Sequence, residues 1–327
     1  MDTRRALLDA LTDGPVSGPE LAAELGVSRA AVWKAVETLR DEGFAVKSTG
    51  DGYAPPTEPP YGAAGIEFGL NVPYTVEYHD ALGSTNDRAR ELAASGESSV
   101  AVVADEQTGG RGRLEREWTA PSGGVWVSVL TSPAIPTSHA PVCTLAAAVA
   151  TTDACREAGV DAGIKWPNDV LVGREARDAG RGDGEPRTNE RGDQKLAGIL
   201  TEMEGEADRV SWLVVGVGIN ANVDVGVLPD GATSLSAVRG EPVDRRRLLQ
   251  RLLERYQELT TMPDRILPAW RERAETLGAS VRVDTPDGEV CGTAVDIEFP
   301  GQLVVDTGDE CVRVHAGDCE HLRPATE

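Results

Sequence analysis

Residues 105–118 read DEQTGGRGRLEREW, a stretch in which three glycines and three arginines lie close together. It has no hydrophobic period, so neither an amphipathic helix nor a half-buried strand is predicted for it. Glycine lets the backbone approach a ligand closely, and arginine presents a planar cation that suits carboxylate and phosphate oxygens. A solvated basic loop is the alternative interpretation. Two later segments, Lys165-Trp166-Pro167-Asn168-Asp169 and Lys195-Leu196-Ala197-Gly198-Ile199-Leu200, favour a ligand-binding loop instead.

The composition is strongly acidic. The 327 residues include 54 Asp and Glu against 32 Lys and Arg, for a net charge of −22, and the length allows two or three domains. This halophilic composition indicates a protein that stays soluble at high salt. Only four of the cations are lysines: Lys34, Lys47, Lys165 and Lys195. Because a guanidinium does not replace a compact ammonium, the two lysines in the candidate ligand segments are favoured as functional residues.

The cysteines and the apolar runs exclude several classes of protein. The five cysteines include no Cys-x-x-Cys pair, so neither a zinc site nor a disulfide framework is predicted. No secretory signal is recognisable, and the longest apolar runs are too short to cross a bilayer. We therefore expect a reduced, cytoplasmic protein that does not enter a membrane.

Residues 1–56 predict a winged helix-turn-helix. Helices are expected at 3–11, after the capping-box pair Ser17 and Glu20, and from Ser28 to about residue 40, followed by a β-wing. The candidate DNA-binding residues lie on the last helix and the wing: Ser28, Arg29, Lys34, Arg40 and Lys47. Residues 1–54 carry six cations and nine anions, a poor electrostatic match to DNA. A winged helix kept for protein contacts is the alternative.

The rest of the chain predicts a linker at 57–74, a large domain at 75–277 and a small all-β domain at 278–327. In the large domain, strands are expected at 75–79, 100–105, 124–131, 194–203 and 209–220. Helices are expected there at 84–94, 142–158, 243–262 and 264–277. Residues 173–194 are rich in glycine, arginine and acids and predict a disordered insertion. The chain is thus expected to be an α+β multidomain protein.

Two common nucleotide-binding patterns are disfavoured. A P-loop is excluded because no lysine follows a glycine anywhere in the chain. The stretch Gly216-Val217-Gly218-Ile219-Asn220 nearly matches a dinucleotide fingerprint, but no amphipathic helix follows it. Its glycines are better suited to close approach by a bound nucleotide, with Asn220 offering a side-chain amide.

These segments, taken in order, resemble those of the biotin–protein ligases. The resemblance is carried by Gln107, the run Gly110-Arg111-Gly112-Arg113, the segments 165–169 and 195–200, and residues 215–220. The Ser28-Arg29-Ala30-Ala31-Val32 helix and the Gly50-Asp51-Gly52-Tyr53 wing are similar to those of the bifunctional ligases that also repress the biotin operon. The resemblance covers nearly the whole chain.

The family resemblance implies a fold and a set of site residues. It implies an N-terminal winged helix-turn-helix, a central α/β domain like that of class II aminoacyl-tRNA synthetases, and a C-terminal SH3-like β-barrel. Biotin would be held by Ser84, Thr85, Asn86, Gln107 and the Gly198 backbone, and covered by Arg111, Gly112 and Arg113. Lys195 would contact the biotin carboxylate and the α-phosphate, and Lys165 an ATP phosphate. Asn168, Asp169 and Asn220 would shape the nucleotide region, with Asp169 near Mg²⁺.

The implied reaction is the formation of biotinyl-5'-AMP from biotin and ATP, followed by transfer of biotin to a lysine of a carboxylase carrier domain. Operator DNA and a homodimer are further implied partners. Two departures from the family pattern weaken the expectations for ligand binding and for DNA binding. Leu114 and Glu115 stand where the family has small or basic residues. Asp51 lies in the wing. A lipoate or octanoate transferase, and a DNA-binding biotin sensor with a decayed active site, are the competing hypotheses.

Overall fold

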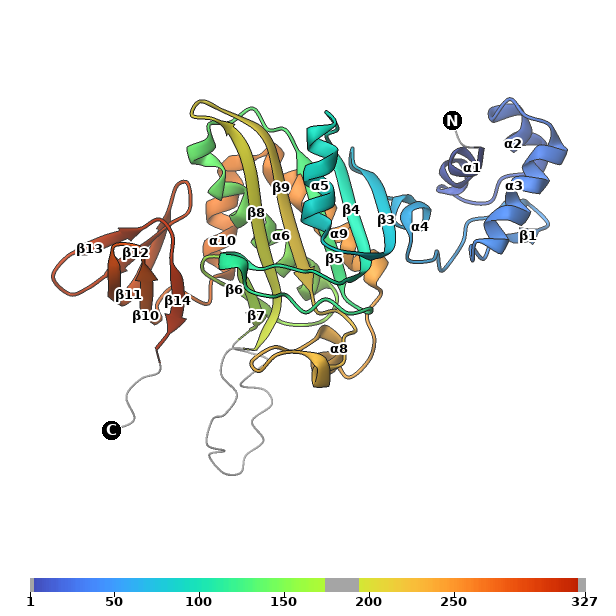
Figure 1. Cartoon of the computed structure of the whole chain (residues 1–327). Helices are drawn as coiled ribbons and strands as arrows, with labels where there is room; N and C mark the ends of the chain where they lie inside the picture. Colours follow the sequence, from blue (N-terminus) through green and yellow to red (C-terminus); the bar gives the residue numbers. More distant parts are fainter. Residues whose placement is uncertain (1–2, 174–193, 323–327) are drawn as a thin grey trace. The chain divides into compact units, whose positions relative to one another are not determined.

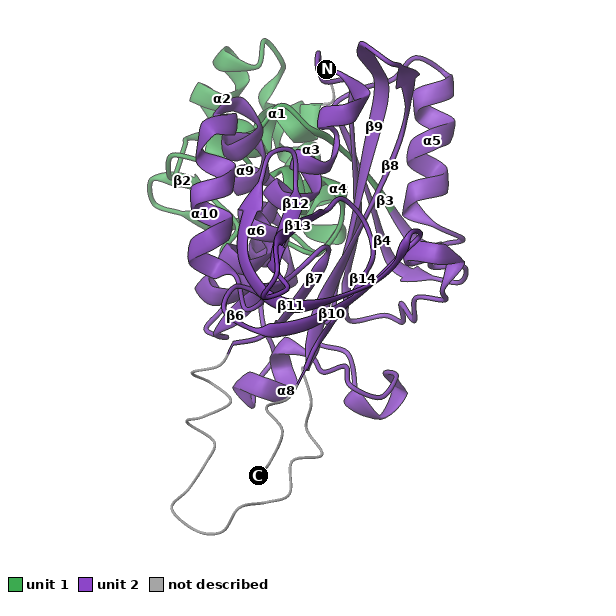
Figure 2. Ribbon diagram, turned by 90° about the vertical axis from the view of Figure 1, so that its left-hand side faces the viewer, with its two compact units in different colours: residues 1–78 green, residues 79–327 purple. Residues whose placement is uncertain are grey.

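The computed structural model describes residues 3–173 and 194–322. The chain forms two compact units, Met1–Tyr78 and His79–Glu327, which Figure 2 distinguishes by colour. The insertion predicted at 173–194 lies outside the described residues except for its two ends. None of the described helices combines the length and the apolarity needed to cross a bilayer.

The first unit contains the predicted winged helix-turn-helix. Its elements are α1 (Thr3–Leu11), α2 (Gly18–Glu24), α3 (Arg29–Asp41), β1 (Lys47–Thr49) and β2 (Gly52–Ala54). The capping box is present: Ser17 Oγ accepts from the Glu20 N–H and the Glu20 carboxylate accepts from the Ser17 N–H. Leucines from all three helices are fully buried against one another, among them Leu7, Leu21 and Leu39. The core of this unit therefore follows the helical period read from the sequence.

The segment expected to be a linker contains a helix that the sequence analysis did not predict. α4 (Ala63–Glu67) buries Ile66 completely, and Ala64 packs against the core of the winged helix. Gly65 permits this, because a Cβ there would lie 1.9 Å from the carbonyl oxygen of Pro60. The apolar residues among the prolines were the missed signal.

A seven-stranded sheet with the order β3-β4-β5-β9-β8-β7-β6 forms the centre of the second unit. Its strands are β3 (Thr75–Leu82), β4 (Val100–Gln107), β5 (Val125–Thr131), β6 (Ala162–Lys165), β7 (Asp169–Val172), β8 (Lys195–Glu206) and β9 (Arg209–Ile219). The pairs from β4 to β6 are antiparallel. β5 is buried along almost its whole length because helices cover both faces of the sheet (Figure 1).

Helix α5 (Thr85–Ala94) packs on one face of the sheet, over β4, β5 and β9, while α6 (Pro141–Glu157) covers the other (Figure 1). Helices α9 (Arg245–Thr261) and α10 (Ile266–Arg273) pack against α6, and α8 (Leu235–Arg239) follows β9. The helix expected at 264–277 is shorter than predicted. It ends at Arg273 because the next residue, Ala274, is extended, and the Glu275 N–H then donates to the Ile164 carbonyl of β6 at 2.8 Å.

The small C-terminal β domain is confirmed as a five-stranded antiparallel sheet with the order β13-β12-β11-β10-β14. Its strands are β10 (Ser280–Thr285), β11 (Gly288–Glu298), β12 (Gln302–Asp306), β13 (Cys311–Val314) and β14 (Asp318–His321). Trp166, between β6 and β7, is buried and donates its indole N–H to the Gly301 carbonyl at 3.0 Å. This contact joins the small domain to the turn that carries the Lys165–Asp169 segment.

Candidate functional site

A cleft of about 480 Å³ lies over β8 and β9 and is bordered by the C-terminal domain. Every residue that the sequence analysis assigned to ligand binding lines it: Ser84, Thr85, Asn86, Gln107, Arg111, Gly112, Arg113, Lys165, Asn168, Asp169, Lys195, Gly198 and Asn220. The C-terminal domain contributes Asp284, Asp318, Cys319 and Glu320 to the same wall. Segments as far apart in the chain as Ser84 and Glu320 therefore meet in one space.

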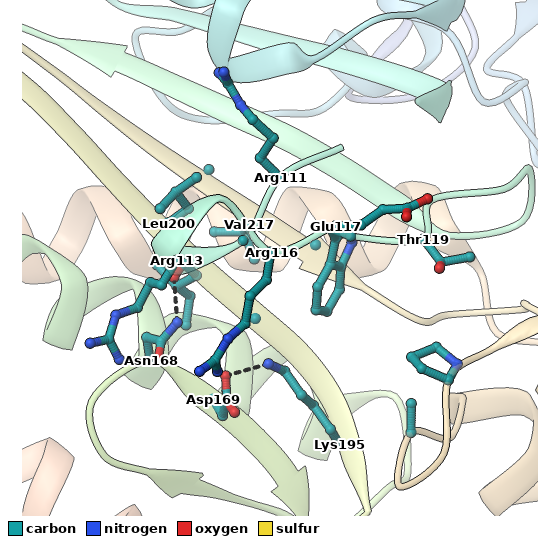
Figure 3. A pocket seen from close by; sticks show the side chains of 18 of the residues that line it. Arg111, Arg113, Arg116, Glu117, Thr119, Asn168, Asp169, Lys195, Leu200 and Val217 are labelled. Atoms are coloured by element: carbon teal, nitrogen blue, oxygen red, sulfur yellow. Dashed lines mark hydrogen bonds and ion pairs between the residues drawn. The ribbon is translucent and has the colours of Figure 1, made fainter. Parts of the chain in front are cut away.

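Strand register brings the two lysine segments together. Lys165 at the end of β6 is opposite Asp169 at the start of β7, and Asp169 is opposite Gly198 of β8. The Nζ of Lys195 lies 2.6 Å from Oδ1 of Asp169 (Figure 3). Asn168 is fixed beside them, because its side-chain amide donates to the Ile199 carbonyl at 2.9 Å.

Arg113 and Arg116 of the loop that follows β4 reach the same end of the cleft (Figure 3). Arg113 donates to Oδ1 of Asn168 at 3.2 Å and to the Gly317 carbonyl at 2.9 Å. Arg116 forms an ion pair with Asp318, whose other carboxylate oxygen is 3.7 Å from Arg113. These ion pairs and hydrogen bonds thus hold the loop on the C-terminal domain. Arg116 is an additional cation of the site, which the sequence analysis had not named.

Arg111 behaves differently from what the sequence analysis expected. Its guanidinium points away from Lys195 and Arg113 and forms an ion pair with Asp87, in the first turn of α5 (Figure 3). Glu115 lies 4.0 Å from the same guanidinium. Arg111 lines the cleft, but its guanidinium is turned toward these two carboxylates, which offset its positive charge.

The opposite end of the cleft is a network of neutral polar side chains. The Thr85 N–H and hydroxyl both donate to Oε1 of Gln107, at 2.7 and 3.0 Å. Ser128, fully buried on β5, lies 2.7 Å from the Thr85 hydroxyl and 2.5 Å from Oδ1 of Asn86. Asn86 in turn donates to Glu202 at 2.6 Å. Ser84 Oγ is used to cap α5, accepting from the Asp87 N–H. Such a network orients its free donors and acceptors toward a polar ligand.

Sequence reasoning missed Trp118, whose indole lines the cleft and packs over Gly198 and Gly218. A Cβ at Gly218 would lie 2.7 Å from the indole nitrogen, and one at Gly198 would lie 3.0 Å from the ring. The ammonium of Lys195 lies 5.1 Å from the ring centroid, a cation–π contact. The two glycines therefore make room for a protein side chain as well as for a ligand. The sequence feature that could have identified Trp118 as a site residue is its position at the end of the glycine–arginine stretch 105–118.

Two polar atoms in the cleft have neither a hydrogen-bond partner nor an ion-pair partner among the described residues. They are the indole nitrogen of Trp118 and Oδ1 of Asn220, and both are buried. The Asn220 amide nitrogen is used, donating to the Thr233 carbonyl at 3.0 Å. Because buried polar atoms are almost always paired, these two are suited to contact a bound molecule.

The loop's glycines also have a structural use. The Trp118 N–H donates to the Gly110 carbonyl at 2.9 Å, and the Gly112 N–H donates to the Arg116 carbonyl at 2.7 Å. A Cβ at Gly110 would lie 2.5 Å from the Trp118 carbonyl oxygen. Glycine at position 110 is thus required for the loop to fold back on itself.

The candidate DNA-binding residues lie in the first unit and divide into two groups. Arg29, Lys34 and Lys47 are exposed. Ser28 caps α3, with its Oγ accepting from the Ala31 N–H at 3.1 Å. Arg40 is engaged inside the unit, where it donates to the Val46 carbonyl and the Ser48 hydroxyl and pairs with Glu37. Arg40 thus ties α3 to the wing, and we no longer assign it a DNA contact.

Comparisons with known proteins agree with this geometry. Residues 80–220 match the Biotin/lipoate A/B protein ligase family, residues 3–54 an HTH domain and residues 276–322 the Biotin protein ligase C terminal domain. A biotin protein ligase from Aquifex aeolicus, solved in complex with biotin and ATP, shares the fold. Its TM-score is 0.60 at 24% identity, with 76% of this chain and 99% of that chain covered.

Two curated relatives are closer in sequence. The biotin--[acetyl-CoA-carboxylase] ligase of Mycobacterium tuberculosis is 33% identical, over 74% of this chain and 86% of the relative. The bifunctional ligase/repressor BirA of Bacillus subtilis is 36% identical over 324 residues, which cover 93% of each chain. With the helix-turn-helix, the ligase domain and the C-terminal domain all matched in order, the chain belongs to the family of bifunctional biotin–protein ligase/repressors.

Proposed function

We propose that this protein attaches biotin to a lysine of a carboxylase carrier domain by way of biotinyl-5'-AMP, and that it also represses transcription in response to biotin. The single observation that carries the ligase proposal is the convergence of Lys165, Lys195 and Arg113, from three separate segments, on one cleft. A site that joins two anions needs such fixed positive charge.

In the first step a carboxylate oxygen of biotin attacks the α-phosphorus of ATP, and pyrophosphate leaves with the electrons of the broken P–O bond. Lys195 is positioned to balance the charge of the carboxylate and the α-phosphate, because its ammonium already sits opposite a carboxylate, Asp169. Lys165 takes an ATP phosphate. Preorganised cations in a partly closed cleft stabilise the transition state without reorganising solvent.

In the second step the amine of the acceptor lysine attacks the acyl carbon of the adenylate, and AMP leaves. The protein supplies no covalent nucleophile in this scheme. Its task is to keep the mixed anhydride from water until the acceptor arrives. We assign this to the loop with Gly112, Arg113 and Arg116, which the C-terminal domain holds over the cleft through Gly317 and Asp318.

The polar end of the cleft fits the biotin ring system. Ser84, Thr85, Asn86 and Gln107 are proposed to hold the ureido group, and the bare backbone of Gly198 to allow close approach of the ligand. The nucleotide would lie toward Asn168 and Asn220, where the unpartnered oxygen of Asn220 can accept a hydrogen bond.

The residues of the cleft do not form a magnesium site of their own. The Asp169 carboxylate, expected to lie near the metal, faces the ammonium of Lys195 at 2.6 Å. No group of three His, Cys, Asp or Glu that could hold a metal ion occurs among the described residues. Magnesium commonly binds through substrate phosphates with few protein ligands. We therefore assign Mg²⁺ no protein cage and derive no step through it.

A transfer assay tests the ligase proposal. Purified protein is incubated with labelled biotin, ATP and a carboxylase carrier domain, and the products are separated on a denaturing gel. We expect label on the carrier that depends on ATP and on the acceptor lysine. Labelled octanoate and lipoate serve as controls, and transfer of either in place of biotin would overturn the assignment.

The repressor proposal includes a homodimer that binds operator DNA. β3 is an edge strand of the central sheet, and an edge strand is a place where a second copy can add to a sheet. Sedimentation should show dimerisation when biotin and ATP are added, and a palindromic fragment upstream of biotin genes should be retarded under the same conditions. A monomer that retards no such fragment would contradict this part of the proposal.

A further inference from the structure

Trp33 is the exposed large apolar side chain of the described winged-helix unit. It lies on α3 with 59% of its surface exposed, whereas Val32, Val36 and Leu39 of the same helix are buried at 1% or less. An indole left in solvent on a helix is unusual, because burying it would stabilise the fold. Its exposure leaves the indole available to a partner.

The net negative charge of this unit hides an uneven distribution of its cations, because some are paired with carboxylates and others are not. Residues 1–54 hold six cations and nine anions. Three of the cations are neutralised: Arg4 pairs with Glu42, Arg5 with Glu67 at 3.1 Å, and Arg40 with Glu37 at 2.6 Å. The other three, Arg29, Lys34 and Lys47, are exposed and form no ion pair with another described residue.

Two of the three free cations lie beside Trp33 on α3, and the third lies on the wing. Arg29 is one helical turn before it on α3, Lys34 follows it directly, and Lys47 begins β1 of the wing. Residues four apart share a face of a helix, so Arg29 and Trp33 are neighbours on the exposed side of α3. Duplex DNA complements this surface, because its backbone is negatively charged and its major groove exposes the apolar methyl groups of thymine.

We propose that Trp33 is the residue through which α3 reads DNA, packing on thymine methyl groups in the major groove, while Arg29, Lys34 and Lys47 contact phosphates. The inference rests on the proposed repressor function. It explains how an acidic unit binds DNA: sequence-dependent apolar contact replaces part of the usual phosphate neutralisation. Three phosphate contacts give a slope of log affinity against log salt of roughly −3 for each winged helix.

The test uses the full-length protein with biotin and ATP and a fluorescent operator duplex, titrated at several salt concentrations. Trp33→Ala should weaken operator binding by roughly tenfold or more with an unchanged salt slope, and should abolish the preference over a scrambled duplex. Trp33→Phe should restore part of that preference. Lys34→Ala, the matched control, should weaken both duplexes alike and reduce the slope by about one per bound winged helix.

Carrier biotinylation by each variant reports that the second unit is folded, and circular dichroism against wild type reports that the helices of the first unit are retained. Wild-type affinity in Trp33→Ala would overturn the inference while leaving operator binding intact. Loss of dimerisation in Trp33→Ala would overturn it as well, by assigning Trp33 to a protein contact. A wild-type protein that binds no operator would remove the repressor function and this inference together.

Discussion

Lys195 and Asp169 form an ion pair on the floor of the cleft, with 2.6 Å between Nζ and Oδ1. Both side chains are largely shielded from solvent, at 31% and 25% exposure. The Trp118 ring packs against the same ammonium. A substrate carboxylate that enters here can replace Asp169 as the partner of Lys195 without any new desolvation of the ammonium.

We expect Lys195→Ala to reduce adenylate formation by roughly 100-fold or more, since it removes a preorganised cation from the transition state. Pyrophosphate release with biotin and ATP measures this step. Lys195→Arg should recover only part of the rate because a planar guanidinium does not replace a compact ammonium. Equal adenylate yields from Lys195→Ala and wild type would refute the assignment.

Arg113 and Arg111 should differ in their contribution, although only two residues separate them. Arg113→Ala removes charge-assisted hydrogen bonds to Asn168 and Gly317, so the covering loop should loosen and the adenylate should leave roughly tenfold faster. Arg111→Ala removes a pair with Asp87 and should affect retention less. The rate at which biotinyl-5'-AMP passes through a desalting column measures the leak. A larger effect in Arg111→Ala would mean that Arg111 turns toward the ligand.

Glu115→Gly should stabilise the folded protein. Leu114 and Glu115 have φ of 54° and 55°, in the left-handed region where a side chain costs about 1 kcal/mol or more. Glycine relieves that strain at position 115, so the free energy of unfolding, measured by denaturant titration, should rise by roughly 0.5–1 kcal/mol. Glu115→Gln removes the charge but keeps the strain, so it should leave the free energy of unfolding unchanged. An equal gain in the Gln variant would show that the charge of Glu115, rather than backbone strain, is the cause.

Gly218→Ala should damage the site more than the fold. The added methyl group would lie 2.7 Å from the Trp118 indole nitrogen, so the ring must move, at a cost of about 1–3 kcal/mol. Biotin and ATP affinities should both fall in calorimetry. Gly226→Ala is the control, because its nearest neighbour would be an ordinary 3.4 Å away. Unaltered affinities in Gly218→Ala would show that the position of Trp118 does not matter for binding.

Asp105 should contribute to stability that is lost in acid. Burial opposes its ionisation, but hydrogen bonds from Ser122 and Arg245 outweigh this and hold the pKa of Asp105 below its ordinary 3.8. Because the folded-state pKa is the lower one, the contribution is fully present above the ordinary value and disappears as pH falls through the folded-state value. Asp105→Asn should therefore lower Tm at pH 7 and less so near pH 3.

The exposed turn residue Asp208 provides the comparison for that experiment. Asp208→Asn should leave Tm close to wild type at both pH values. A Tm difference between Asp105→Asn and wild type that stays constant with pH would contradict the linkage.

Much of the site could be predicted because its residues lie in short segments with distinctive chemistry. Lys165 and Asp169 stand in one short segment and Lys195 in another, and the scarcity of lysine in an acidic chain makes each lysine conspicuous. Ser128 and Glu202, which fix Asn86, could not be found this way. They occupy strands whose alternation looks like that of any other strand, and their partner is distant in the chain.

By itself the sequence determined the order of the domains, the segments that carry the charge and the positions without a side chain, because these depend on local composition and period. Only the tertiary structure decided that Arg113 and Arg116 reach the same end of the cleft as Lys195, while the Arg111 guanidinium turns away toward Asp87. That outcome depends on strand register and on the counter-charges Asp87 and Asp318, which reach the loop from opposite directions along the chain.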